Sequence, residues 1–165
     1  MPILIKSPGT IIPGTISDDK IMNIDFAPTL LDFAGLSIPE EMQGRSFKNT
    51  FTKNSDTKRN AVYYHYYEYP IWHNVQPHYG VRTDKYKLIH FYYSMDEWEL
   101  YDMDADPHEM NNIYENADPG LISKLKFKLD SLKKYYGDTS SINDMISMTD
   151  TVIQRVYNEP VKEIK

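Results

Sequence analysis

The chain has 165 residues, a net charge of -6 and a pI near 5.3. Its length suits one domain, or one domain with an appendage, and is sufficient for a hydrophobic core. The acidic balance argues against a nucleic-acid-binding protein, because no basic stripe is present to neutralise phosphates. The absence of cysteine excludes disulfides, zinc-thiolate sites and thiol catalysis. No apolar run approaches a membrane span of about 18 residues, so we expect no membrane partner.

The first 60 residues are typical of a strand, a helix and a loop. Residues 2–6 (PILIK) predict a short strand that a Ser-Pro-Gly turn signal ends. Asp25 is expected to cap a helix that runs to Ala34, with Gly35 as its left-handed stop. The apolar face of this helix needs a sheet to pack on, and little else in this region can supply one. We therefore expect this opening to be the cut end of a larger domain.

Residues 61–101 predict a small antiparallel sheet. Segments 62–69, 80–93 and 98–101 have strand character, and residues 82–86 (RTDKY) indicate a tight turn inside the second of them. Connections as short as these favour antiparallel pairing.

An aromatic stretch, residues 63–93, lies within this sheet and holds nine of the fourteen tyrosines and four of the five histidines. Aromatic faces mixed with imidazole, guanidinium and carboxylate groups are typical of a polar-ligand pocket. The same composition fits a sheet whose hydroxyls and imidazoles are hydrogen-bonded within the protein and bind no ligand. Residue types alone leave both interpretations open.

Two features follow the sheet. Residues 102–106 (DMDAD) copy the start of an EF-hand calcium loop, but Pro107 stands where that loop requires glycine. We expect instead that Asp106, Pro107 and Glu109 form a capping box for the turn that follows.

The clearest helix starts at Asp118 and Pro119 and ends at Gly137, with leucines at helical spacing on one face. Its lysines are interpreted as a solvated face and not as a basic patch, because the leucine stripe must cover the sheet. Residues 138–141 have the composition of a linker, and residues 142–157 predict a further weak helix or two.

Several of these segments together resemble the sulfatase family. The strand and Pro-Gly turn at the start, the DFAPT run at 25–29 and the GRS run at 44–46 resemble the end of the large catalytic domain of that family. The later runs HNVQPHYGVRTDKYKLIHFYY and EWELYDMDADPHEMNN, with the lysine-rich helix, are similar to its small C-terminal subdomain. The resemblance is strongest to N-acetylglucosamine-6-sulfatase-like members and covers residues 1 to about 137.

The resemblance implies an α+β fold in three parts. Residues 1–60 would be the end of an alkaline-phosphatase-like α/β domain, and residues 61–137 a small antiparallel sheet covered by a long C-terminal helix. Residues 138–165 would be a tail of unknown role. It further implies a sulfuric ester hydrolase that acts on a sulfated amino sugar or glycan, with the upstream catalytic part of the same enzyme as partner. A periplasmic or secreted location in a bacterium is favoured for that complete enzyme.

Family members use a formylglycine, made from the first residue of a Cys/Ser-x-Pro-Ser/Ala-Arg motif, and a calcium ion that balances the sulfate charge. This sequence lacks the motif: only Pro39 has a serine two places earlier, and Glu40 and Glu41 follow it. We therefore expect no catalytic residue and no metal ligand here. Formylglycine and calcium would belong to the upstream part, and the chain alone would be inactive.

The resemblance assigns substrate contacts to four residues: His73, Asn74, His78 and Arg82. The spacing of His73 and His78 predicts that both lie on one proline-containing loop, beside Trp72, where imidazoles reach sugar hydroxyls or sulfate oxygens. For Arg82, a strand-end ion pair with Asp84 or Glu68 is an equally good interpretation.

Two functional hypotheses remain at this point. The chain is either the recognition and closure segment of a sulfatase, or a non-catalytic carbohydrate-binding or interaction module for which the aromatic stretch is the platform. An opening that belongs to the core of another domain favours the first hypothesis.

Overall fold

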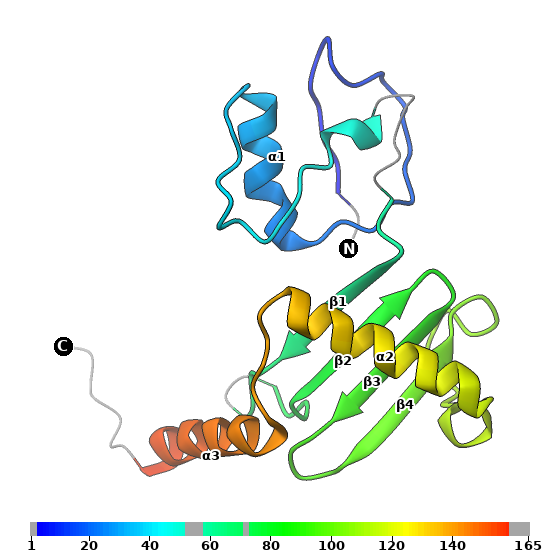
Figure 1. The fold of residues 1–165 in the computed structure, drawn as a ribbon, viewed down its shortest axis with the longest axis vertical. Helices are drawn as coiled ribbons and strands as arrows, with labels where there is room; N and C mark the ends of the chain where they lie inside the picture. Colours follow the sequence, from blue (N-terminus) through cyan, green and yellow to red (C-terminus); the bar gives the residue numbers. More distant parts are fainter. Residues whose placement is uncertain (1–2, 52–57, 71–72, 159–165) are drawn as a thin grey trace. The chain divides into compact units, whose positions relative to one another are not determined.

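The computed structural model describes residues 3–51, 58–70 and 73–158, which divide into two compact units, Met1–Val62 and Tyr63–Lys165 (Figure 1). The first unit contains short helical segments, and the second contains a sheet with two long helices. Within these described ranges, no helix is both long and apolar enough to cross a membrane.

The first unit is built around helix α1 (Phe26–Phe33), which follows the 3-10 helix η1 (Asn23–Asp25) and precedes η2 (Lys48–Phe51). Gly35 has a φ of 71° just after the end of α1, so the predicted left-handed stop is confirmed.

The strand predicted at residues 2–6 is wrong. Residue 2 lies outside the described residues, residues 3–6 form no strand, and the side chain of Leu4 is 99% exposed. A strand requires a hydrogen-bonded neighbour, and none of the described segments pairs with this one.

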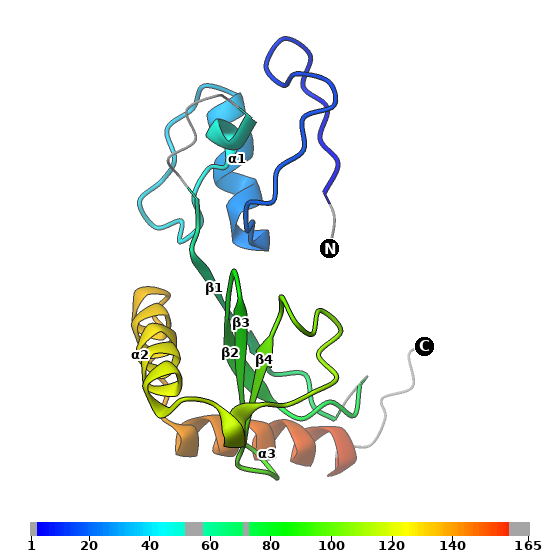
Figure 2. The same ribbon diagram turned by 90° about the vertical axis from the view of Figure 1, so that its right-hand side faces the viewer.

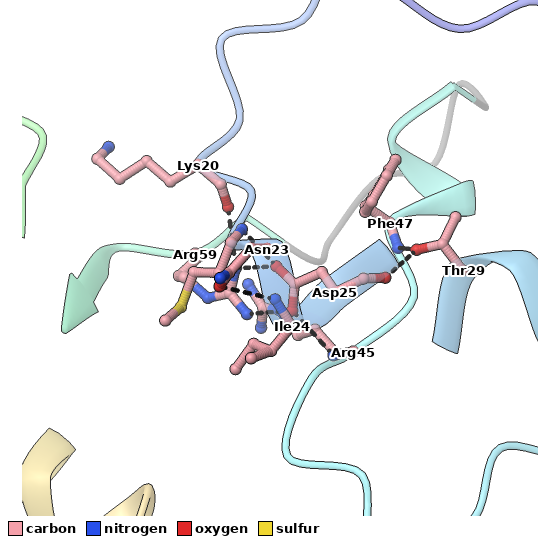
Figure 3. A network of polar contacts seen from close by, with 9 residues as sticks. Lys20, Asn23, Ile24, Asp25, Thr29, Arg45, Phe47 and Arg59 are labelled. Atoms are coloured by element: carbon pink, nitrogen blue, oxygen red, sulfur yellow. Dashed lines mark hydrogen bonds and ion pairs between the residues drawn. The ribbon is translucent and has the colours of Figure 1, made fainter. Parts of the chain in front are cut away.

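Asp25 binds an arginine instead of capping α1 (Figure 3). Its carboxylate accepts bonds from both Nη atoms of Arg59, at 2.5 and 2.9 Å, and from the backbone N–H groups of Met22 and Arg45. Burial alone would raise the pKa of Asp25, but these bonds hold it below its usual range. Asp25 therefore occupies the predicted N-cap position of α1, but the predicted capping bond is absent, because its carboxylate ties together segments up to 34 residues apart.

The second unit contains a four-stranded sheet in the order β1-β2-β3-β4. The strands are β1 (Ala61–Tyr66), β2 (His78–Thr83), β3 (Tyr86–Phe91) and β4 (Glu97–Asp102). Strand β2 pairs antiparallel with β3, and β3 with β4, so that Leu88 lies opposite both Val81 and Leu100. The predicted antiparallel sheet and the turn between β2 and β3 are confirmed.

Helix α2 (Pro119–Tyr135) covers one face of this sheet, as the nearly edge-on view in Figure 2 shows. The Asp118 carboxylate accepts a bond from Leu121 N at 2.8 Å, and Gly137 has a φ of 71° at the other end. Leu125 and Leu129 are buried, as are the sheet residues that face them. Burying each leucine contributes about 1.5–3 kcal/mol.

Two lysines of α2 do not belong to a solvated face. Lys126 Nζ lies 3.9 Å from the ring centroid of Trp98, and Lys133 Nζ lies 4.0 Å from that of Tyr79. Their charges rest on aromatic rings of the sheet, where a cation–π contact is favourable by about 0.5–2 kcal/mol. The interpretation of the lysines as solvated is wrong for these two.

The predicted capping box after β4 is also wrong. No helix begins at Pro107, and Glu109 has a φ of 56°, which no helical residue adopts. The Asp106 carboxylate accepts a bond from Asn111 N, while the Glu109 carboxylate pairs with Lys87 at 2.5 Å. Only the 3-10 helix η3 (Tyr114–Asn116) forms later in this segment.

Helix α3 (Ile142–Asn158) follows as one continuous helix, which confirms the prediction of helical structure there. Its start is a reciprocal capping box, in which Ser141 N binds the Asp144 carboxylate and Asp144 N binds Ser141 Oγ, both at 3.1 Å. Met145 and Thr149 are its buried residues.

Candidate functional site

The residues with predicted substrate contacts lie along strand β2 and the segment before it. His73 and Asn74 are exposed in residues 73–77, whereas Trp72 lies outside the described residues. His78 is the first residue of β2 and Arg82 the fifth. The expectation that His73 and His78 share a loop is therefore wrong for His78, because β2 starts two residues earlier than the pattern indicates.

His78 is half-buried and held in one orientation. Its ring lies parallel to that of Tyr66, with centroids 5.3 Å apart, and contacts Phe91 at 5.0 Å. Nδ1 donates to the carbonyl oxygen of Gln76 at 2.8 Å, since a carbonyl can only accept. Nε2 has no hydrogen-bond partner among the residues that the structure describes. This nitrogen is therefore the atom of His78 that can meet a ligand.

Gly80 lies between His78 and Arg82 on the same side of β2, because side chains alternate along a strand. A Cβ at Gly80 would lie 2.6 Å from Leu88 O and 2.7 Å from the Tyr64 hydroxyl. The missing side chain makes room for the Tyr64 ring, which contacts His78 edge-on at 5.8 Å. Tyr64 thus packs against both His78 and the β2 backbone at Gly80.

Arg82 lies at a shallow, open depression of the surface, which we call the Arg82 cleft; it is lined by Tyr64, Arg82, Lys87, Met103 and Glu109. Arg82 Nη1 and the Tyr64 hydroxyl are buried, and neither has a hydrogen-bond partner within the described chain. His78 lies about 13 Å away, at roughly 3.3 Å per residue of strand. The structure therefore brings the four predicted residues to one strand and the segment before it, but does not gather them at one point.

A polar cluster that sequence reasoning missed lies at the end of α2. Asp138 accepts bonds from the Tyr63 hydroxyl and from His65 Nδ1, the latter at 2.8 Å, and the Tyr92 hydroxyl reaches His65 Nε2 at 3.0 Å. Burial lowers the pKa of His65, although Asp138 acts in the opposite direction. Burial alone would raise the pKa of Asp138, but the bonds from Tyr63 and His65 hold it below its usual range. The sequence gives one sign of this cluster, which is that the charged residue Asp138 directly follows Gly137, the glycine that ends α2.

This cluster forms one wall of a cavity of about 350 Å³ whose other wall is α3, with Met145, Met148 and Val152. Both nitrogens of His65 are engaged, so no free base faces the cavity from this residue. The cluster fixes β1 to the segment between α2 and α3, and we interpret it as structural.

His90 is engaged in the same way. Nδ1 lies 2.8 Å from the Tyr79 hydroxyl, Nε2 lies 2.6 Å from Asp96 Oδ1, and the ring stacks on Trp98 with centroids 4.1 Å apart. Burial is the main reason that the pKa of His90 is lowered. The imidazoles on the α2 side of the sheet therefore hold the core together, whereas His78 on the opposite side keeps one nitrogen without a partner in the described part of the chain.

The described residues do not provide a set of side chains that could bind a metal ion. Among the described residues, no three His, Asp or Glu side chains gather closely enough to hold a metal ion. A calcium ion, which is bound by six to eight oxygen atoms, therefore has no fitting set of ligands in this described part.

Comparison with known proteins gives a consistent result. The family model for N-sulphoglucosamine sulphohydrolase, C-terminal, matches residues 1–135. The chain is 49% identical over 142 residues to an N-acetylglucosamine-6-O-sulfatase of Bacteroides thetaiotaomicron, covering 84% of this chain and 25% of that protein. It is 30% identical to the N-acetylglucosamine-6-sulfatase of Bos taurus, over 84% of this chain and 30% of that protein.

A solved structure of a protein in complex with its substrate D-glucosamine-2-N,6-O-disulfate matches with a TM-score of 0.68 and 48% identity, over 72% of this chain and 25% of that chain. The chain therefore spans between 25% and 30% of the length of these curated relatives. Since the family match extends over residues 1–135, the chain belongs to the family of sulfatase C-terminal regions represented by N-sulphoglucosamine sulphohydrolase.

Proposed function

We propose that this chain is the C-terminal part of a sulfatase that removes sulfate from a sulfated amino sugar or glycan. The observation that carries the proposal is the 49% identity to an N-acetylglucosamine-6-O-sulfatase across 84% of the chain. A glucosamine bearing sulfate is the substrate class that this relative and the substrate-bound homologue have in common.

The chain contributes the wall that recognises the substrate and closes the fold. His73 and Asn74 are exposed on the segment before β2, and His78 presents from a fixed ring its Nε2, which no described residue engages. Nε2 of His78 accepts from a sugar hydroxyl because Nδ1 carries the proton of that ring, and the N–H groups of His73 and Asn74 donate to sugar and sulfate oxygens, the latter of which only accept. Arg82 supplies a permanent positive charge farther along the strand.

The reacting groups come from a part of the enzyme outside this sequence. In the family, formylglycine supplies the nucleophile and calcium balances the sulfate charge. This chain has no Cys/Ser-x-Pro-Ser/Ala-Arg motif, so its own residues bind and orient the sugar and do not attack the ester. Recognition by remote contacts of this kind raises the rate by fixing the sulfate where the nucleophile acts.

A chimera tests this proposal. The matching region of the Bacteroides thetaiotaomicron relative is replaced by residues 1–137 of this chain, and release of sulfate from glucosamine 6-sulfate is measured. We expect turnover by the chimera and none by the 165-residue chain alone with calcium. If the chimera folds but is inactive, while the chain alone binds glycans, the function is that of a carbohydrate-binding module instead.

A further inference from the structure

The segment between β1 and β2, residues 67–77, contacts the connection between β3 and β4 near both of its own ends. Near its start, the ring of Tyr69 packs against that of Tyr93, with centroids 5.6 Å apart. Near its end, Gln76 Oε1 accepts a bond from the Ser94 hydroxyl at 2.8 Å. Two consecutive residues of the β3–β4 connection therefore hold a segment of which residues 67–70 and 73–77 are described.

Two of the candidate substrate contacts, His73 and Asn74, lie between these two attachment points. Neither side chain has a hydrogen-bond partner in the described part of the chain, so their placement depends on the backbone of the segment. Gln76 also links this backbone to β2, because its carbonyl oxygen accepts from His78 Nδ1 at 2.8 Å. The contacts at Tyr69 and Gln76 therefore bear on the placement of both side chains.

Helix α3 passes the end of the sheet at which β3 ends and β4 begins, and it contacts their connection (Figure 2). Asp150 Oδ1 accepts a bond from the Tyr93 hydroxyl at 2.7 Å. This bond raises the pKa of Tyr93 to about 12, so the hydroxyl keeps its proton and remains a donor at neutral pH. Tyr93 is thus held by α3 through its hydroxyl while its ring contacts Tyr69.

Helix α3 is anchored next to this contact. Thr149, directly before Asp150, is 6% exposed and lies beside the Tyr92 hydroxyl. Met145, one turn earlier, is 3% exposed. The region that the family model matches ends before α3 begins. The support for the segment is therefore fixed in the core of the second unit, but it comes from a part of the chain that the family match does not include.

We propose that α3 positions the 67–77 segment for substrate recognition, and that Asp150 and Tyr93 are positioning residues for His73 and Asn74. The inference rests on the proposed function, in which these last two residues contact the sugar. A segment that is already held in place need not be ordered when the sugar binds. Its support therefore strengthens binding without any contact between α3 and the substrate.

NMR relaxation of the backbone amides of the 165-residue chain tests the support without any substrate. Asp150→Ala removes the acceptor and should lower the order parameters of the Asn74 and Val75 amides. Asp150→Asn keeps an acceptor oxygen and should leave them unchanged. Loss of α3 is not the cause of such a change, because alanine has the higher helix propensity. Gln154→Ala, at an exposed position of α3, is the matched control and should change nothing.

Tyr93→Phe removes the donor of the same bond but keeps the ring that contacts Tyr69. It should lower the same order parameters as Asp150→Ala. The double variant should show no further loss, because both changes remove one interaction. Additive losses would mean that the two residues act separately, and they would overturn the assigned role of the bond.

The kinetics of a chimera that carries residues 1–165 connect this support to recognition. Asp150→Ala should raise KM for glucosamine 6-sulfate about two- to tenfold, the value of one hydrogen bond, with kcat nearly unchanged. Asp150→Asn should restore the wild-type KM, and KM for a small aryl sulfate should stay constant in both variants. A merely structural loss would instead reduce the amount of active enzyme and lower kcat on both substrates alike.

The proposal is overturned if Asp150→Ala leaves the order parameters of the segment unchanged. It is also overturned if this variant leaves KM unchanged in a chimera that loses activity through His73→Ala, and in that case the proposed function stands without the support from α3. A chimera that folds but is inactive without any of these substitutions contradicts the proposed function. The relaxation measurement then still decides whether α3 holds the segment.

Discussion

The two faces of the four-stranded sheet differ in how their polar groups are used. On the face under α2, Tyr79 and His90 are buried and hydrogen-bonded to each other at 2.8 Å. On the opposite face, His78 keeps a free Nε2 and Arg82 Nη1 has no partner among the described residues. His78, Tyr79 and Arg82 belong to one six-residue strand. One strand can therefore support the core with alternate side chains, while the others present polar groups that the core does not use.

The largest effect is expected on the α2 side. Leu129 of α2 is 1% exposed, on the side of the helix that faces the sheet. Leu129→Ala should therefore lower the free energy of unfolding by about 2–5 kcal/mol. Phe127→Ala removes a larger side chain from the same helix, but Phe127 is 74% exposed and its loss should cost less than about 0.5 kcal/mol. Urea denaturation measures both. Equal costs would mean that α2 is not packed on the sheet.

On the opposite face, steric crowding at Gly80 gives the next effect. Gly80→Ala should destabilise by about 1–3 kcal/mol, because the added methyl group meets Leu88 O and the Tyr64 hydroxyl. In a Tyr64→Ala background the cost should fall, since two of the three clashing atoms, the Tyr64 hydroxyl oxygen and Cζ, are absent. Thermal unfolding is measured for the wild type, the two single variants and the double variant, which together form a double-mutant cycle. Additive costs would contradict the contact between Tyr64 and β2.

The dependence of the unfolding free energy on pH tests the burial of His65. The pKa of His65 is lowered in the folded state by burial, so its contribution to stability is complete above the unfolded value of about 6.5 and is lost as the pH falls through the folded value. The unfolding free energy of wild type should therefore decrease between pH 7 and pH 5. His65→Asn should show a shallower decrease. An identical slope would show that His65 is not titrating with folding.

Much of this arrangement is predictable from local sequence signals. The leucine spacing and the glycine stop define α2, and the Arg-Thr-Asp-Lys-Tyr run defines the turn between β2 and β3. Local rules fail where a side chain has a distant partner. Local spacing predicts that Asp25 caps α1, but Arg59, 34 residues away, binds it. The same kind of rule places Glu109 in a capping box, but it pairs with Lys87.

The candidate site shows the same limit. His73, Asn74, His78 and Arg82 come from the sequence, and the structure adds the parts that no motif contains. Lys87 and Glu109 meet across 22 residues of sequence to form the Arg82 cleft. Asp138 follows a glycine in a segment with the composition of a linker, yet it joins Tyr63 and His65. Contacts of this kind depend on the assembled sheet, and therefore they could not be predicted from residue spacing.

The central claim, that this chain supplies the recognition wall of a sulfatase, is tested most directly by two substrates in the chimeric enzyme. His73→Ala and His78→Ala are compared with His108→Ala, which removes an exposed histidine outside the site. His73→Ala should lower kcat/KM for glucosamine 6-sulfate about ten- to a hundredfold, the value of one hydrogen bond to a charged group. His78→Ala should lower it about two- to tenfold, the value of one hydrogen bond between neutral groups, because Nε2 accepts from a sugar hydroxyl. The loss on a small aryl sulfate, which does not reach the wall, should be much smaller. Equal losses on both substrates, or no loss on either, would contradict the account.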